Sequence, residues 1–251
     1  MRNKALIIVL LIVLLGILAL CITAAINGGM LLYYSIDATI FDYFPFAQSL
    51  IRTLSLLAFT LIYCKTWYSG ESPGSAFTDL YLLAAALVET RVFNDYTNLT
   101  GICFVPPVVL SRLLIASVIL MLLSIISSAL YYQNNEYGAV SLLKGLDTAT
   151  AIIMGLLLPV PLSFENLFLS VPTYWIFIIL CATAFLACLI LMLTDPPGIG
   201  TFKHLSSILI VGGIFAIFFF NITYADLVGS ILLTLGYTAN AILSASNSIR
   251  L

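Results

Sequence analysis

Hydrophobic residues occur along the chain in long continuous runs, which short polar stretches separate. One run, LLIASVILMLLSIISSAL at residues 113–130, has nearly the 20-residue length that a helix needs to cross a hydrocarbon core about 30 Å thick. Strands of a transmembrane barrel would instead alternate apolar and polar positions over about ten residues, and these runs do not alternate. The pattern predicts an all-α fold, a polytopic transmembrane helical bundle.

The polar breaks divide the chain into about eight predicted spans. They occupy residues 5–26, 46–64, 76–94, 107–131, 139–159, 172–193, 205–222 and 227–246. A chain of seven spans is the alternative, because the last two runs could form one long broken segment, but the polar stretch NITYAD favours two. The connections are too short for a folded soluble domain, so residues 1–251 are expected to form a single transmembrane domain.

The longest connection, residues 27–45, carries the aromatic stretch LLYYSIDATIFDYFP. Aromatic side chains favour the headgroup layer of a membrane, so we expect an extracytoplasmic interfacial segment here, with a short helix on the membrane surface. The first run also resembles a signal peptide with a cleavage site after Ala25. We expect it to be kept as the first helix.

Composition and charge support a membrane location and an orientation. Hydrophobic residues make up 62% of the chain and charged residues 8%, against about 25% charged in a soluble domain. With the N-terminus inside, Arg2, Lys4, Lys65, Lys203 and Arg250 all lie on the cytoplasmic side, as the positive-inside rule requires. We therefore expect an N-in/C-in protein of the plasma membrane or bacterial inner membrane. The net charge of −2 gives no indication of nucleic-acid binding.

Four charged residues are predicted to share one depth beneath the outer headgroups. Arg52 lies near the outer end of the second span, Glu89 and Arg91 near that of the third, and Arg112 near that of the fourth. Charges inside a membrane usually pair or line a wet cavity, and guanidinium groups bind carboxylate and phosphate well. The four are therefore a candidate ligand-binding site. The alternative is that they reach the interface or form ion pairs that fix the helices.

Spacing along single helices predicts two further pairs. Arg91 and Asp95 are four residues apart and can meet on one helix face, which leaves Glu89 for an arginine on another helix. Lys144 and Asp147 are three apart in the fifth span, so they are either a structural salt bridge or one station of an ion path.

Several chemistries lack the residues that they require. His204 is the only histidine, so haem cannot be held between two histidines, and no nucleophile–histidine pair or nucleotide-binding motif is present. The five cysteines show no C-x-x-C spacing and are expected to be packing residues. We predict no catalytic residue, no metal site, no cofactor and no enzyme, although an intramembrane acid–base role for Glu89 stays open.

Three functions follow from this picture. The first is a membrane-embedded subunit or scaffold of a larger complex, with other membrane or cytoplasmic subunits and the lipid bilayer as partners and an outward-facing anion or lipid-headgroup site. The second is a small transporter or channel for an anionic solute, using Arg52, Glu89, Arg91 and Arg112. The third is a membrane sensor that acts through a separate cytoplasmic partner. The first is preferred because no soluble module is predicted.

Overall fold

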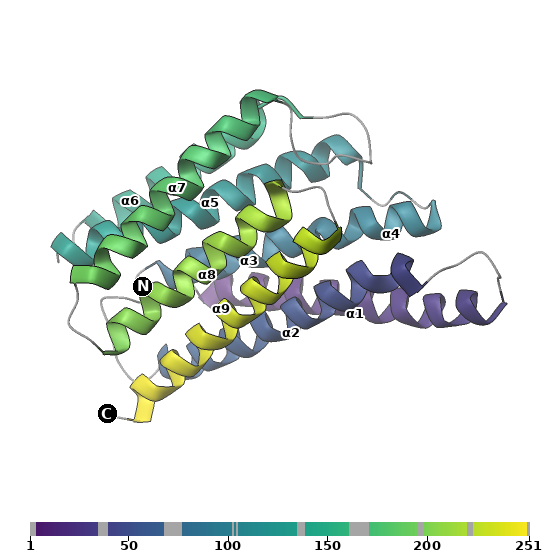
Figure 1. Ribbon diagram of the computed structural model, residues 1–251, viewed down its shortest axis with the longest axis horizontal. Coiled ribbons are helices and arrows are strands. Elements are labelled where there is room, and N and C mark those ends of the chain that lie inside the picture. Colours follow the sequence, from purple (N-terminus) through teal and green to yellow (C-terminus); the bar gives the residue numbers. More distant parts are fainter. Residues whose placement is uncertain are drawn as a thin grey trace.

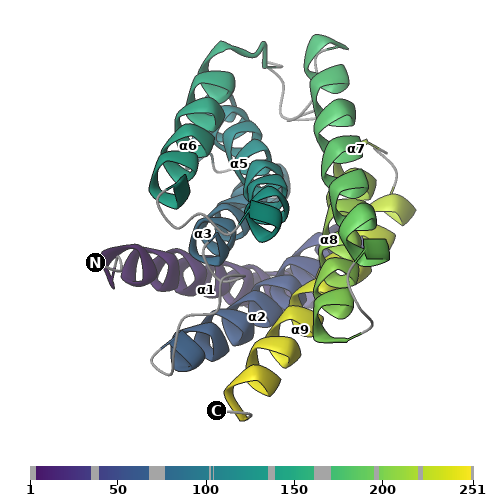
Figure 2. The ribbon, with the colours of Figure 1, turned by 90° about the vertical axis from the view of Figure 1, so that its left-hand side faces the viewer.

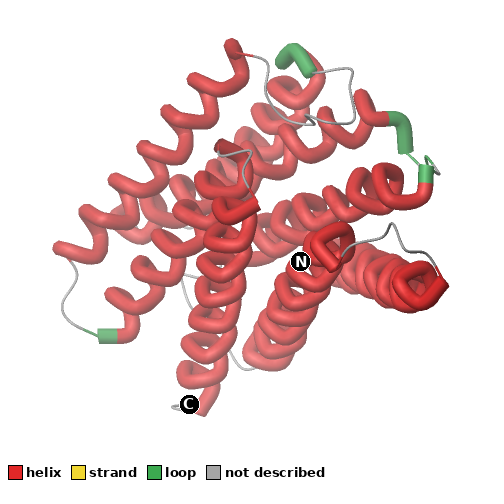
Figure 3. Tube along the Cα trace, turned by 45° about the vertical axis from the view of Figure 1, so that its right-hand side comes forward, coloured by secondary structure: helices red, strands yellow, loops and turns green. Residues whose placement is uncertain are grey.

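The described part of the chain is helical apart from short turns, as the computed structural model shows (Figures 1 and 3). The structure describes residues 4–34, 40–67, 77–101, 103, 105–134, 139–160, 171–194, 198–219 and 223–249. Its elements are α1 (Lys4–Tyr34), α2 (Ile40–Trp67), α3 (Thr78–Val88), the 3₁₀ turn η2 (Glu89–Arg91), α4 (Val92–Thr100), α5 (Pro107–Asn134), α6 (Ala139–Leu157), α7 (Val171–Thr194), α8 (Ile199–Phe219) and α9 (Thr223–Ile249). The all-helical prediction is confirmed.

Six of the described helices, α2 and α5 to α9, are long and apolar enough to cross a membrane. Helix α1 contains a shorter apolar stretch, Ile8–Thr23. The chain is thus a multi-pass membrane protein by the length and composition of its helices. The start of α1 and the end of α9 lie at the same end of the bundle (Figure 1), as an even number of crossings requires. The count of eight spans and the N-in/C-in orientation stay predictions.

The predicted boundaries agree with the helices except in the interfacial segment and in the third span. The last two spans are separate, because α8 ends at Phe219 and α9 begins at Thr223. Within the predicted interfacial segment, residues 27–34 continue α1 and residues 40–45 begin α2, while residues 35–39 lie outside the described part. Its position at the membrane surface stays a prediction. The third span is broken where α3 ends at Val88, because η2 separates it from α4.

Helix α3 lies at the centre of the bundle, between α1, α2 and α5 (Figure 2). Its consecutive residues Ala84, Ala85 and Ala86 are all 0% exposed, so the helix is covered over most of its circumference, and the face of Asp79, Leu83 and Leu87 is partly exposed. A helix that is apolar all round is stable only in such a place, and alanine side chains let the neighbouring helices approach closely. Helix α6, in contrast, packs mainly on α5 at the edge of the bundle (Figure 2).

Helices α8 and α9 form a close antiparallel pair around glycines. A Cβ atom on Gly229 would lie 2.5 Å from Ile217 Cγ1 and 2.8 Å from the backbone oxygen of Gly213. A Cβ atom on Gly236 would lie 2.4 Å from Ile210 Cγ1. The two backbones therefore meet where only glycine fits, as at other close contacts between membrane helices.

Replacing Gly229 with alanine should loosen this pair. The added methyl group would overlap both a side chain and a backbone oxygen, so we expect the free energy of unfolding to fall by about 1–3 kcal/mol. SDS titration of the purified protein in mixed micelles measures this quantity. Gly145→Ala is the matched control, since nothing lies within 4 Å of its added Cβ and alanine favours a helix. Equal effects of the two substitutions would contradict the close packing.

Candidate functional site

The central helix breaks at Glu89. Helix α3 ends at Val88, and the backbone tightens into the 3₁₀ turn η2 before α4 continues. The Thr90 hydroxyl donates to the backbone oxygen of Leu87 at 2.6 Å, and such local bonds compete with regular helix geometry. A 3₁₀ turn inside a helix often marks a strained or functional position. Here the turn places the Glu89 carboxylate in the interior, where it is 1% exposed.

Glu89 is paired with Arg52 of α2. Arg52 Nε donates to Glu89 Oε1 at 2.9 Å and lies 3.1 Å from Oε2. Ser49, one turn earlier on the same face of α2, donates its hydroxyl to Glu89 Oε2 at 3.3 Å. Both charged residues are buried, with Arg52 only 9% exposed. The sequence prediction that Glu89 meets an arginine from a neighbouring helix is confirmed for Arg52.

Helix α9 completes this network through Ser230. Arg52 Nη1 donates to Ser230 Oγ at 2.5 Å. The Ser230 hydroxyl in turn lies within donating distance of the Asp226 backbone oxygen, at 2.6 Å, and of Gln48 Oε1, at 3.0 Å. We call Gln48, Ser49, Arg52, Glu89 and Ser230 the Arg52–Glu89 network. It joins α2, η2 and α9, and each of its members is buried.

Arg91 does not join the network and does not pair with Asp95 as predicted. It forms an ion pair with Asp226 of α9, with 3.0 Å between Nη2 and Oδ2 and 3.4 Å between Nη1 and Oδ1. The two side chains are 27% and 30% exposed. Asp95 lies within electrostatic range of Arg91, Arg52 and Asp226. An acid on a neighbouring helix thus replaces the predicted partner on the same helix.

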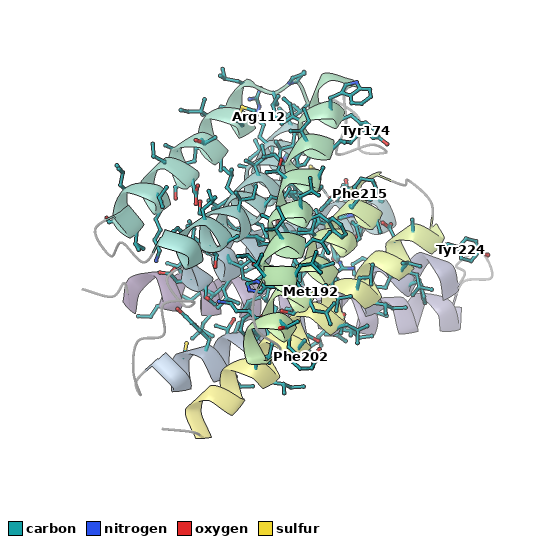
Figure 4. All side chains as sticks on the ribbon, turned by 60° about the vertical axis from the view of Figure 1, so that its left-hand side comes forward. Arg112, Tyr174, Met192, Phe202, Phe215 and Tyr224 are labelled. Atoms are coloured by element: carbon teal, nitrogen blue, oxygen red, sulfur yellow. The ribbon has the colours of Figure 1, made fainter. Side chains whose placement is uncertain are left out.

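Arg112 also points away from the network. Its guanidinium donates to the backbone oxygen of Leu156, in the last turn of α6. Carbonyl groups in the last turn of a helix lack partners within that helix and attract cations. Figure 4 shows Arg112 near one end of the bundle, far from Phe202 at the other. Of the four residues predicted to form one site, only Arg52 and Glu89 therefore contact each other.

The predicted salt bridge between Lys144 and Asp147 is wrong. Lys144 Nζ instead contacts both carboxylate oxygens of Asp79, at 2.7 and 2.9 Å. Asp147 accepts a hydrogen bond from Ser127 of α5 at 3.0 Å. Asp79 stands in the first turn of α3, so the ion pair ties α6 to the central helix. Asp147 meanwhile binds α6 to α5.

Polar residues follow one face of α9 along its length. Asp226, Ser230, Tyr237 and Asn240 are separated by four, seven and three residues, which places them on one side of a helix. Tyr237 is 0% exposed, and its hydroxyl has no hydrogen-bond partner among the described residues. The sequence analysis did not predict this stripe, because it assigned Asp226 only to the polar stretch NITYAD that separates the last two spans. The helical spacing of the four residues was the available signal.

A cavity of about 60 Å³ lies at the end of the bundle where α3 and α8 begin. Residues from α2, α5, α7, α8 and α9 surround it, together with the first turns of α3 and Phe77, which precedes them. Among the residues that the structure describes, its polar lining includes Thr78, Tyr81, Ser124, Ser128, Lys203, His204, Ser207 and Asn240. Asn240 also ends the α9 stripe, and its Oδ1 accepts a hydrogen bond from Ser206 at 2.8 Å. The cavity and the Arg52–Glu89 network therefore lie along the same helix.

Within the described residues, no group of three or more His, Cys, Asp or Glu side chains is placed to hold a metal ion. No family model, curated protein or solved structure matches this chain.

Removing the Glu89 charge should destabilise the bundle strongly. Glu89→Gln would leave the Arg52 guanidinium buried without its counter-charge, and breaking a buried pair in this way costs about 3–5 kcal/mol. The free energy of unfolding in mixed micelles measures the loss. Arg91→Gln is the control, because its pair with Asp226 is partly exposed and such pairs contribute about 1 kcal/mol or less. Similar losses in the two variants would argue against a dry Arg52–Glu89 pair.

Proposed function

We propose that this multi-pass membrane protein is a membrane-embedded subunit or scaffold of a larger complex and has no enzymatic activity of its own. The observation that carries the proposal is the use of the intramembrane charges. Arg52 and Glu89, which are both buried, bind each other and two serines of the same bundle. These charges therefore hold helices together, and few of their hydrogen-bonding positions are left to bind a solute.

The other charged pairs support the same conclusion. Arg91 is balanced by Asp226, and Lys144 by Asp79. Each of these contacts joins two different helices, so each fixes the position of one helix against another. A vestibule for anions would require cations that face water and lack a competing carboxylate. For this reason the proposal does not include the outward-facing anion site that the sequence suggested.

A scaffold of this kind requires partners, which we expect to be other membrane or cytoplasmic subunits. Affinity purification of the tagged full-length protein in a mild detergent, followed by quantitative mass spectrometry, tests for them. We expect at least one protein to be recovered in a fixed ratio to the chain, and a tagged unrelated multi-pass protein serves as the control. Recovery of the chain alone, before and after chemical cross-linking in the membrane, would contradict the proposal.

Transport of a small anionic solute is a second candidate, favoured by the polar stripe of α9 that ends at the cavity. Tyr237→Phe tests it sharply, because the substitution removes only a hydroxyl that has no hydrogen-bond partner among the described residues. On the scaffold proposal, proteoliposomes with the wild-type protein alone show no solute flux. Flux that Tyr237→Phe abolishes, and that Thr238→Val on the exposed side of α9 retains, would replace the scaffold by a transporter.

A further inference from the structure

We propose that Asp147 of α6 is an intramembrane proton-binding site, occupied at neutral pH, so that its carboxyl group is uncharged in the folded bundle. The inference goes beyond the scaffold proposal and does not depend on it. It rests on the place of the carboxyl group in the interface of α5 and α6, on its single hydrogen bond and on the distribution of basic residues along the chain.

Asp147 lies on the face of α6 that packs against α5. Asp147, Ala151 and Gly155 follow one another at intervals of four residues, so they share one face of the helix, and all three are buried. A Cβ atom on Gly155 would lie 2.7 Å from Ala116 Cβ and 3.0 Å from the backbone oxygen of Arg112, both in α5. The two helices therefore approach closely, and the Asp147 side chain is enclosed in their interface.

Within this interface the Asp147 carboxyl group has one hydrogen-bond donor. Ser127 of α5 donates to Oδ1 at 3.0 Å, whereas Oδ2 has almost no accessible surface and no hydrogen-bond partner among the described residues. An oxygen enclosed in this way leaves no space for a water molecule or a metal ion beside it, but a proton needs none. A buried carboxylate without a counter-charge is so costly that it takes up a proton instead. A proton on Oδ2 leaves the hydrogen bond from Ser127 to Oδ1 intact.

The nearest basic residue in the sequence is already used by another acid. Lys144 stands three residues before Asp147, but its Nζ contacts both carboxylate oxygens of Asp79 in α3. Lys203 and His204 of α8 lie in the wall of the cavity, whose described lining includes no residue of α6. Within the described part of the bundle, Ser127 is thus the group that interacts with the Asp147 carboxyl.

The helix packed against Asp147 supplies no counter-charge either. The basic residue of α5 is Arg112, which donates to Leu156, nine residues from Asp147 or about 13 Å along α6. Between Arg112 and Lys144 the sequence has no Lys, Arg or His, so the undescribed connection at residues 135–138 adds no positive charge. The titratable residues of that connection and of the last turn of α5 are Glu136, Tyr131, Tyr132 and Tyr137.

The bound proton makes the attachment of α6 dependent on pH. Loss of the proton would leave a lone negative charge between α5 and α6, and α6 packs mainly on α5 at the edge of the bundle (Figure 2). In the unfolded chain the carboxyl group meets water and ionises near pH 4, as an ordinary aspartate does at about 3.9. The folded bundle then holds one proton more than the unfolded chain, so the contribution of Asp147 to stability is full below about pH 4 and falls as the pH rises.

Infrared spectroscopy of the purified full-length protein in detergent at neutral pH tests the site directly. A protonated carboxyl group has a C=O stretching band that a carboxylate lacks, and we expect Asp147→Asn to remove one such band. Ser127→Ala should keep the band and shift it to higher frequency, because the C=O group loses its hydrogen bond. Asp226→Asn is the matched control and should leave the band unchanged, since Asp226 forms an ion pair with Arg91 on other helices.

Each outcome of the infrared experiment decides for or against the site. Loss of the band in Asp147→Asn alone supports it. A wild-type spectrum without a protonated-carboxyl band overturns the inference without any variant, and so does a band that Asp147→Asn leaves unchanged. If size-exclusion chromatography shows that Asp147→Asn does not fold, the Ser127→Ala spectrum decides, because a band that does not shift there also overturns the inference.

The pH dependence of unfolding in mixed micelles provides a second test. Relative to Asp147→Asn, which cannot bind the proton, we expect the unfolding equilibrium constant of the wild-type protein to rise with pH by up to about tenfold per pH unit, as release of one proton on unfolding requires. Equal pH dependence of the two proteins overturns the inference. Both measurements use the isolated chain, so failure to find partner subunits would not affect them.

Discussion

Burying an arginine in a membrane bundle is the constraint on which this structure depends. An isolated charge is expensive at membrane depth, and Arg52 is buried beside the central helix. Glu89 neutralises it, and Ser49 and Ser230 provide further hydrogen bonds from α2 and α9. The pair requires α2, η2 and α9 to stay in a fixed relation, because a shift of any one would leave a buried charged or polar group without its partner.

The break in the central helix and the close glycine contacts between α8 and α9 are consistent with this fixed relation of α2, η2 and α9. Helix α3 is short and has small alanine side chains at its centre, so its neighbours pack closely around it. The 3₁₀ turn at its end directs Glu89 toward α2. Helix α9 in turn approaches α8 through Gly229 and Gly236 while it presents a polar stripe to the bundle interior. The bundle thereby acquires two different regions along α9. One contains paired charges that fix the helices, and the other is a cavity with a partly polar lining that includes Ser124 and Asn240.

Much of the fold could be predicted from the sequence, whereas the site could be predicted only in part. Long apolar runs and polar breaks such as NITYAD locate helices because both signals are local in the chain. The pairing of Glu89 with an arginine on another helix followed from the cost of a lone buried charge. The pairs of Arg91 with Asp226 and of Lys144 with Asp79 were missed, because spacing rules compare residues on one helix. Which acid on another helix comes closest depends on the packing, which spacing along one chain segment does not reveal.

A double-mutant cycle on the free energy of unfolding tests the central claim most directly. It compares Arg52→Gln, Glu89→Gln and the variant with both substitutions in the same mixed micelles. If the two side chains form a dry pair, the double variant is more stable than the sum of the single losses predicts, with a coupling of at least about 1 kcal/mol. Losses that simply add, with a coupling within about 0.3 kcal/mol, would show that Arg52 and Glu89 do not depend on each other and would contradict this account.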